Sequence, residues 1–477
     1  MERTGRLRRA PELLRRAALA LMLSLAGAGP ALGHAILRYS QPAAGARLTA
    51  PPRELRLTFS EAPELAITTI ELLDAAGGVV ALGRLSKADP MTIVVPIAGV
   101  LAPGDYTVVW RTAAADGHAT HGRFGFTLLA PAGATMPMPP PGGEAGGGVT
   151  APGRAAPPPS HHVMPGTAED VLDAGSPGYV AVRWLLFGAL LAMVGAAAFR
   201  LFVLGAIRRQ PRGAATALEP ALARRTASLG LVAGVVLVVA TAARLLAESY
   251  AMHGAAHALD PDRLRMLLGA TVWGWGWFVQ AGAGALGIVA FALARRGLAG
   301  GWALAALAAL AAAASPALSG HAAAAPRLTT LAILADTGHV LGAAGWLGGL
   351  LALMVAAVPL AREDGGAVAE LVHAFSPTAL FFAGLTFSSG VFSAWLHLGS
   401  VAALWSSGYG RTLVVKLAVV ALTAGTGAYN WLRVRPALGS TEATRRLRRS
   451  ATLELLIGVV VLLVTAVLVA LSAPASE

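Results

Sequence analysis

LTTLAILADTGHVLGAAGWLGGLLALMVAAV, residues 328–358, decides the fold of most of this chain. The stretch is apolar for longer than the roughly 20 residues that an α-helix needs to cross a bilayer. Asp336 and His339 lie three positions apart in it and therefore share one face of the helix. An ionisable pair at membrane depth is costly unless it faces the interior of a bundle, so the stretch predicts a transmembrane helix with a functional face. The alternative is a structural Asp–His hydrogen bond that holds two helices together.

Seven further apolar runs are also long enough to cross a membrane. The whole chain is 56% hydrophobic and 13% charged, which excludes an ordinary soluble protein. We therefore expect an all-α polytopic bundle of about eight transmembrane helices within residues 176–477. The expected spans are 179–204, 226–250, 268–293, 302–318, 328–358, 377–398, 413–432 and 451–471.

Arginines mark the loops after the first, third and seventh spans, as at Arg208, Arg295 and Arg445. By the positive-inside rule these loops are cytoplasmic, which places the segment before the first span outside the membrane. The net charge of +12 thus reports topology. No basic stripe with interleaved aromatic residues indicates nucleic-acid binding.

Two local expectations follow from this topology. Trp273, Trp275 and Trp277 are expected to form an aromatic belt at the membrane interface. His373 is placed in a cytoplasmic loop between the fifth and sixth spans.

Residues 1–33 have the pattern of a secretory signal peptide: a basic cluster, an apolar run from Ala17 to Ala28, and small residues ending at Gly33. Cleavage after Gly33 would give His34 a free α-amine beside its imidazole. One residue would then offer two nitrogens that can close a chelate ring on a metal ion. The plainer alternative is that His34 is an ordinary first residue of a secreted domain.

Residues 34–130 alternate short β-type segments with turns, which predicts a small antiparallel sandwich or barrel. Residues 54–60 show the period of a half-buried strand, with Leu55, Leu57 and Phe59 on one face. Further strands are expected at 67–73, 78–82, 92–97, 106–111 and 122–129.

Asp116 and His118 lie two apart in a glycine-flanked loop between the last two expected strands. In an extended loop their side chains project to the same side. By itself such a pair is most often a solvated turn. Together with a processed His34 it supplies one amine, two imidazoles and one carboxylate, a set that suits Cu(II).

At this point residues 34–130 resemble the CopC family of periplasmic copper-binding proteins. The resemblance rests on residues 34–37, the turn at 42–45, LTFSE at 57–61, GDYTV at 104–108 with WR at 110–111, and DGH at 116–118 leading to Gly122. It implies that His34, Asp116 and His118 bind Cu(II). His121 is then either an auxiliary ligand or, as we favour, a surface histidine.

Residues 131–175 are dominated by Pro, Gly and Ala and predict a flexible linker. The segment contains Met136, Met138, His161, His162 and Met164. Thioethers and imidazoles could pass on a soft Cu(I) ion, or these residues could be incidental to a low-complexity segment.

Residues 180–472 resemble the CopD copper-resistance membrane family. The resemblance rests on SGHA at 319–322, Asp336 to His339 with WLGG at 346–349, SG at 389–390, LHLG at 396–399, and YGR at 409–411 with Lys416. It implies movement of copper across the inner membrane, usually inward. As a hypothesis, we assign a role in this transport to His321, Asp336 and His339.

The sequence therefore predicts a two-part, multi-pass protein of the bacterial inner membrane. A periplasmic β-domain would capture Cu(II) and pass copper to a transmembrane domain, with other periplasmic copper carriers as further partners. No nucleotide-binding loop is present, so transport would be passive or ion-coupled. We do not expect an enzyme, because Asp116 would fill a coordination position that an oxidative copper enzyme keeps open.

Two alternatives stay open. One is a haem-bearing membrane oxidoreductase with the copper domain as its partner, which needs facing histidines at matched depth on two helices. The other is a copper sensor or storage protein without transport.

One prediction follows from the N-terminal chelate. Extending the mature chain by one residue before His34 converts the amine into an amide, which is a far weaker ligand. Cu(II) affinity, measured by competition titration, should fall by orders of magnitude. Unchanged affinity would refute the amine ligand.

Overall fold

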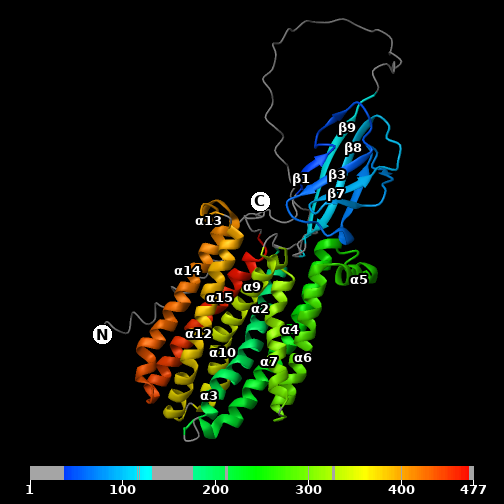
Figure 1. Cartoon of the computed structure of the whole chain (residues 1–477). Coiled ribbons are helices and arrows are strands. Elements are labelled where there is room, and N and C mark those ends of the chain that lie inside the picture. Colours follow the sequence, from blue (N-terminus) through cyan, green and yellow to red (C-terminus); the bar gives the residue numbers. More distant parts are fainter. Residues whose placement is uncertain are drawn as a thin grey trace, which may run out of the picture.

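The computed structural model describes residues 37–114, 117, 119–130, 176–209, 213–298, 300–324, 328–361, 363–398 and 400–471. The expected signal peptide, the linker at 131–175 and the ligands His34, Asp116 and His118 lie outside the described residues. For His321 the description covers the backbone alone. Figure 1 shows a β-sandwich at one end of a long helical bundle.

Two sheets pack across one apolar core in the sandwich, as the alternating pattern predicted. The first has the order β1-β3-β7-β6, with β1 (Leu37–Gln41), β3 (Glu54–Phe59), β7 (Thr92–Pro96) and β6 (Ser86–Asp89). The second has the order β2-β9-β8-β4-β5, with β2 (Arg47–Leu48), β9 (Ala119–Leu128), β8 (Gly104–Ala113), β4 (Thr69–Leu73) and β5 (Val79–Val80). The short β2–β9 pair is parallel, and the other pairs are antiparallel.

Alternation along β3 explains why the two sheets stay together. Leu55 and Leu57 are fully buried, and the Phe59 ring meets the edge of Trp110 from β8 at a centroid distance of 5.3 Å. Burial of each such side chain contributes roughly 1.5–3 kcal/mol to the packing of the two sheets.

The apolar alternation in the sequence did not predict the strands that have few buried side chains. Every residue of β6 is exposed, because β6 is an edge strand of its sheet, so it has no apolar alternation to detect. The strand expected from Ile67 begins at Thr69, since the 3₁₀ turn η1 (Leu65–Ile67) precedes it.

Eight helices in the described part are long and apolar enough to cross a membrane, which confirms the expected number. They span Pro177–Arg208, Thr216–His253, Val272–Arg295, Gly301–Leu318, Thr329–Ala361, Gly365–Leu398, Gly408–Ala437 and Glu442–Leu468. Their main α-helical parts are α2 (Pro177–Ala198), α4 (Glu219–His253), α6 (Val272–Arg295), α7 (Gly301–Leu318), α9 (Thr329–Ala343), α12 (Gly365–Leu398), α14 (Gly408–Tyr429) and α15 (Thr441–Leu468). The shorter helices are α3 (Gly205–Arg208), α5 (Pro261–Ala270), α8 (His321–Ala324), α10 (Gly349–Ala352), α11 (Val358–Ala361) and α13 (Ala403–Ser406).

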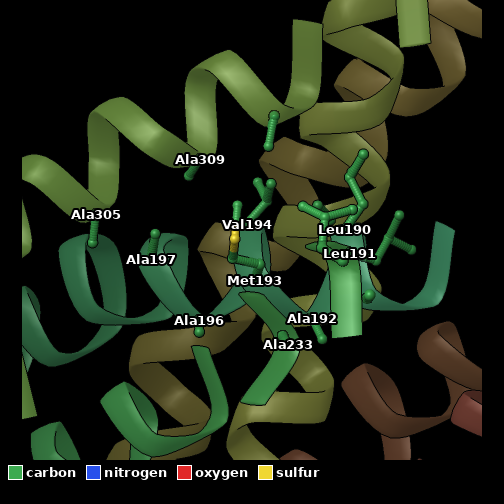
Figure 2. Close-up of a cluster of buried hydrophobic side chains, with 14 of the residues drawn as sticks. Leu190, Leu191, Ala192, Met193, Val194, Ala196, Ala197, Ala233, Ala305 and Ala309 are labelled. Carbon is green, nitrogen blue, oxygen red and sulfur yellow. The ribbon is translucent and has the colours of Figure 1, made fainter. Parts of the chain in front are cut away.

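Helix α2 occupies the centre of the bundle. Its small residues let α4 and α7 approach closely, and Figure 2 shows Ala196 and Ala197 of α2 among Ala233, Ala305 and Ala309 of these neighbours. Four π-helical turns interrupt the regular helices: η2 (Phe199–Leu204), η4 (Ala344–Gly348), η5 (Leu353–Ala357) and η6 (Asn430–Val434).

The sixth span begins twelve residues before the expected start at Pro377. Helix α12 runs from Gly365 through Pro377, so the placement of His373 in a loop is wrong. A proline interrupts the helical hydrogen bonds, but hydroxyl groups beside it can compensate in a membrane helix. Ser376 Oγ donates to the Val372 carbonyl over 2.6 Å.

An even number of spans places both ends of the bundle at the same membrane face. A reporter fused after Glu477 should therefore respond as an external tag in intact cells, as should one inserted before Pro177. A tag between α14 and α15, at Ser440, is the cytoplasmic control. A cytoplasmic signal from the tag after Glu477 would show that one span is miscounted.

Candidate functional site

The predicted copper loop is the tip of the β8–β9 hairpin. The two strands pair without interruption down to Ala113 and Ala119. The Gly117 N–H donates to the Ala114 carbonyl over 2.9 Å, and Gly117 has φ +82°, a conformation that favours glycine. Asp116 and His118 flank this turn, outside the described residues. His121 is exposed on β9, opposite Arg111 of β8.

This hairpin tip rests on the membrane domain. A Cβ atom added to Gly117 would lie 2.1 Å from Trp273 Cδ1, so only glycine fits against that ring. Trp273 is 1% exposed, whereas Trp275 is 70% exposed. The expected interfacial belt is therefore wrong for Trp273, because the β-domain covers it.

Apolar and polar contacts together define the docking interface. Its apolar cluster joins Ile67 and Ala113 of the β-domain to Met252, Leu267 and Trp273 of the membrane domain. At its edges, Arg111 Nη1 donates to the Met252 carbonyl over 2.7 Å, and the Val272 N–H donates to Glu64 Oε1 over 3.3 Å. The hairpin tip thus sits over the junction of α4, α5 and α6, at the end of the bundle seen in Figure 1.

His253 ends α4 within this interface, beside Met252. Its Nδ1 lies 3.1 Å from the Ser249 carbonyl oxygen, so the Nδ1–H donates there and Nε2 keeps its lone pair. Metal-binding histidines commonly have this arrangement, in which a carbonyl fixes the ring and the other nitrogen faces the metal. The half-buried His253 is therefore available as a ligand near the hairpin tip.

A buried polar network lies beneath Trp273. The Arg244 guanidinium lies 5.0 Å from the centre of the Trp273 ring, and Arg244 donates to Ser319 Oγ over 3.3 Å and to Gln280 Oε1 over 3.5 Å. The network therefore connects the docking interface to Ser319, two residues before His321.

Asp336 and His339 of α9 face two other helices. His339 Nδ1 lies 3.0 Å from the Thr386 carbonyl oxygen of α12, so this nitrogen donates its proton and Nε2 keeps its lone pair. The fit is close, because a Cβ atom added to Gly390 of α12 would lie 3.1 Å from His339 Cε1. The Asp336 carboxylate interacts electrostatically with Lys416 on α14.

Lys416 is the site residue that sequence reasoning missed as the partner of Asp336. In the sequence Lys416 stands out as a lone cation inside an apolar run. Only the packing of α14 near α9 brings it close to the Asp336 carboxylate. Tyr409 of α14 also interacts with Asp336. The helix face that carries Asp336 therefore lies opposite two side chains of α14, the ammonium of Lys416 and the phenol of Tyr409.

Asp336 and His339 can supply two metal ligands, a carboxylate oxygen and an imidazole nitrogen. Across the described ranges, no group of three or more His, Asp or Glu side chains is placed to hold a metal ion. Two ligands are fewer than the four that a structural zinc site uses.

Family models match both parts of the chain. Residues 37–129 match the CopC domain, residues 171–329 match the copper resistance protein D-like N-terminal domain, and residues 369–468 match copper resistance protein D.

Among curated relatives, the copper transport protein CutJ of Bacillus subtilis is 25% identical over 451 residues, covering 92% of this chain and 74% of that protein. Protein YobA of Escherichia coli K12 is 31% identical over 115 residues, covering 24% of this chain and 93% of that protein. Among solved structures, CopC from Methylosinus trichosporium OB3b is 29% identical, with a TM-score of 0.20, and covers 22% of this chain and 100% of its own. PcoC, a methionine-rich copper resistance protein from Escherichia coli, is 28% identical, with a TM-score of 0.19, and covers 20% of this chain and 99% of its own.

The resemblance found in the sequence is thereby confirmed over both halves, and the eight apolar helices make the chain a multi-pass membrane protein. The chain belongs to the copper resistance and transport family in which a CopC domain precedes a CopD membrane domain.

Proposed function

We propose that this protein captures Cu(II) outside the bacterial inner membrane and conducts copper inward through its helical bundle. The observation that carries the proposal is the docking of the β8–β9 hairpin tip on Trp273, because the loop that holds Asp116 and His118 then lies at the outer end of the bundle. The copper-transport name of the relative CutJ supports the same function.

Capture would use the amine and imidazole of His34 with Asp116 and His118. Nitrogen and carboxylate donors in a square arrangement suit Cu(II). His253 is the proposed first acceptor, because its free Nε2 belongs to the helix end on which the hairpin docks. Arg111 binds the Met252 carbonyl next to it and keeps the two surfaces in register.

Passage through the bundle would then use His321, Asp336 and His339. In the metal-free protein the Lys416 ammonium neutralises the Asp336 carboxylate, which would otherwise be costly at membrane depth. A copper ion bound between Asp336 and His339 Nε2 replaces that positive charge, and Lys416 must then move away or lose its proton. The linker also contains Met and His residues, whose thioether and imidazole groups are ligands that suit Cu(I).

Neither alternative gains support from the bundle. A haem group needs two facing histidines at matched depth. The structure places His253 and His397 at helix ends and His373 on the exposed surface. Among the histidine side chains that it describes, this leaves His339 in the interior. A sensor or storage protein would not need the Asp336–Lys416 pair at membrane depth.

Isotopic copper accumulation in proteoliposomes that contain the full chain tests the proposal. Asp336→Ala and His339→Ala should each lower the initial uptake rate by at least about tenfold, the scale expected when a metal site loses a group. Cu(II) binding to the outer domain should stay unchanged. His373→Ala, on the exposed surface of α12, is the control and should transport normally. Normal flux in both site variants would return Asp336 and His339 to a structural role.

Trp273→Ala tests the handover. Loss of a buried tryptophan costs roughly 3–5 kcal/mol of packing, so the hairpin tip should detach. We expect faster amide exchange at residues 64–67 and 111–114 and slower copper uptake at low copper concentration, with unchanged Cu(II) affinity. The matched control is Trp275→Ala on the same helix, because Trp275 is 70% exposed. Unchanged exchange and uptake for Trp273→Ala would contradict a docked handover.

A further inference from the structure

A second ionisable group lies deep in the bundle, away from Asp336 and His339. Glu454 of α15 is 3% exposed. Its carboxylate accepts hydrogen bonds from Trp346 Nε1 over 3.1 Å and from Asn430 Nδ2 over 2.9 Å. Both donors stand on π-helical turns, Trp346 on η4 and Asn430 on η6. Such turns are rare and frequently mark functional sites.

The carboxylate has neutral neighbours. Trp346 and Asn430 face it, and Gly427 of α14 closes a third side, where an added Cβ atom would lie 3.3 Å from Glu454 Oε1. No cation in the described part acts on Glu454 electrostatically. Burying a carboxylate inside the membrane without a counter-charge costs free energy, so such a group is first interpreted as a functional site.

Six charged or titratable side chains on the helices around α15 interact with groups other than Glu454. Arg200 pairs with Glu219, Arg183 lies over the Tyr179 ring, Glu370 accepts from the Ala214 and Ala215 N–H groups, His373 donates to the Ala369 carbonyl, Lys416 interacts with Asp336, and Arg435 lies over the Trp431 ring. On α15 itself the charged residue before Glu454 is Arg449, more than one helical turn away.

Asn430 can form a hydrogen bond with Glu454 in either protonation state. In the structure its amide nitrogen donates to the carboxylate, and its Oδ1 is buried with no hydrogen-bond partner among the described residues. A protonated carboxyl group has one O–H to donate. Rotation of the Asn430 amide would present Oδ1 to that O–H and give the unpaired oxygen a partner.

The end of the bundle that carries the arginines is hollowed next to Asn430. A pocket of about 430 Å³ lies beside η6, lined by Tyr429, Arg433, Val434, Ala437, Ala443 and Arg446. Tyr429 is the chain neighbour of Asn430. On the proposed topology this pocket is cytoplasmic, so a proton would travel between the cytoplasm and Glu454 past Asn430.

Helix α9 connects the two sites. Trp346 follows His339 by seven residues, roughly 10 Å along the helix axis, and stands on the π-helical turn η4 that continues α9. A shift of α9 when copper binds at Asp336 and His339 would therefore change the hydrogen bond from Trp346 to Glu454.

We propose that Glu454 is a proton-binding site whose occupancy is coupled, through α9, to the passage of copper. This inference rests on the proposed copper transport. The proton binds a carboxylate oxygen of Glu454 and leaves by the same oxygen, so no further reactant is needed.

Copper uptake into proteoliposomes with and without a pH gradient tests the coupling. For the wild-type protein the gradient should change the initial rate severalfold, and for Glu454→Gln the ratio of the two rates should fall to one. Glu442→Gln, an exposed site on the same helix, is the control and should behave as the wild type. A Glu454→Gln protein that still responds to the gradient, or a wild-type protein that responds only to a Na⁺ gradient, would overturn the proposal.

Infrared difference spectra between acidic and neutral pH give a readout that does not depend on copper flux. The chain has 25 Asp and Glu residues, so the expected signal is one component of the protonated-carboxyl band that is present in the wild type, missing from Glu454→Gln and shifted in Glu454→Asp. Identical spectra for all three proteins would refute proton binding at Glu454. Absence of copper flux in the wild type would instead refute the transport on which the coupling depends.

Discussion

Direct backbone contact between α2 and η4, the π-helical turn that continues α9, is the constraint on which the rest of the bundle depends. A Cβ atom on Gly195 would lie 2.2 Å from the Gly348 carbonyl carbon, and one on Gly348 would lie 2.1 Å from the Leu191 oxygen. Lipid tails are as apolar as the helices, so the hydrophobic effect does not drive helices together in a membrane. Close packing such as this supplies the attraction instead. With α2 against one side of this segment, the polar residues of α9 face α12 and α14.

The two candidate sites lie in different environments. The β8–β9 hairpin belongs to the β-domain and turns at Gly117, whose N–H donates to the Ala114 carbonyl. A membrane helix must neutralise each polar group it carries, as Asp336 with Lys416 illustrates. The docking interface joins the two environments, because Trp273 touches the hairpin tip on one side and Arg244 on the other.

Prediction from sequence succeeded where buried positions produce a regular pattern of apolar residues. Strand β3 alternates between buried and partly exposed residues, and its bounds matched the expectation closely. The eight spans were recognisable because bilayer thickness sets a minimum apolar length. Strand β6 is exposed throughout, so it left no such pattern. The start of α12 was missed for another reason, because Pro377 stands inside that helix whereas proline usually ends one. The likeness to CopC and CopD was also visible in sequence motifs.

The sequence by itself determined the two-part architecture, the number of spans and the candidate ligands, because these depend on local period, length and residue type. It also placed Asp336 and His339 on one helix face, since three residues nearly complete a turn. Only the tertiary structure decided what faces them. The pairing of Asp336 with Lys416, the burial of Trp273 beneath Gly117 and the enclosure of Glu454 by Trp346 and Asn430 join residues far apart in the chain. Such contacts depend on how whole helices pack, and no local pattern records that packing.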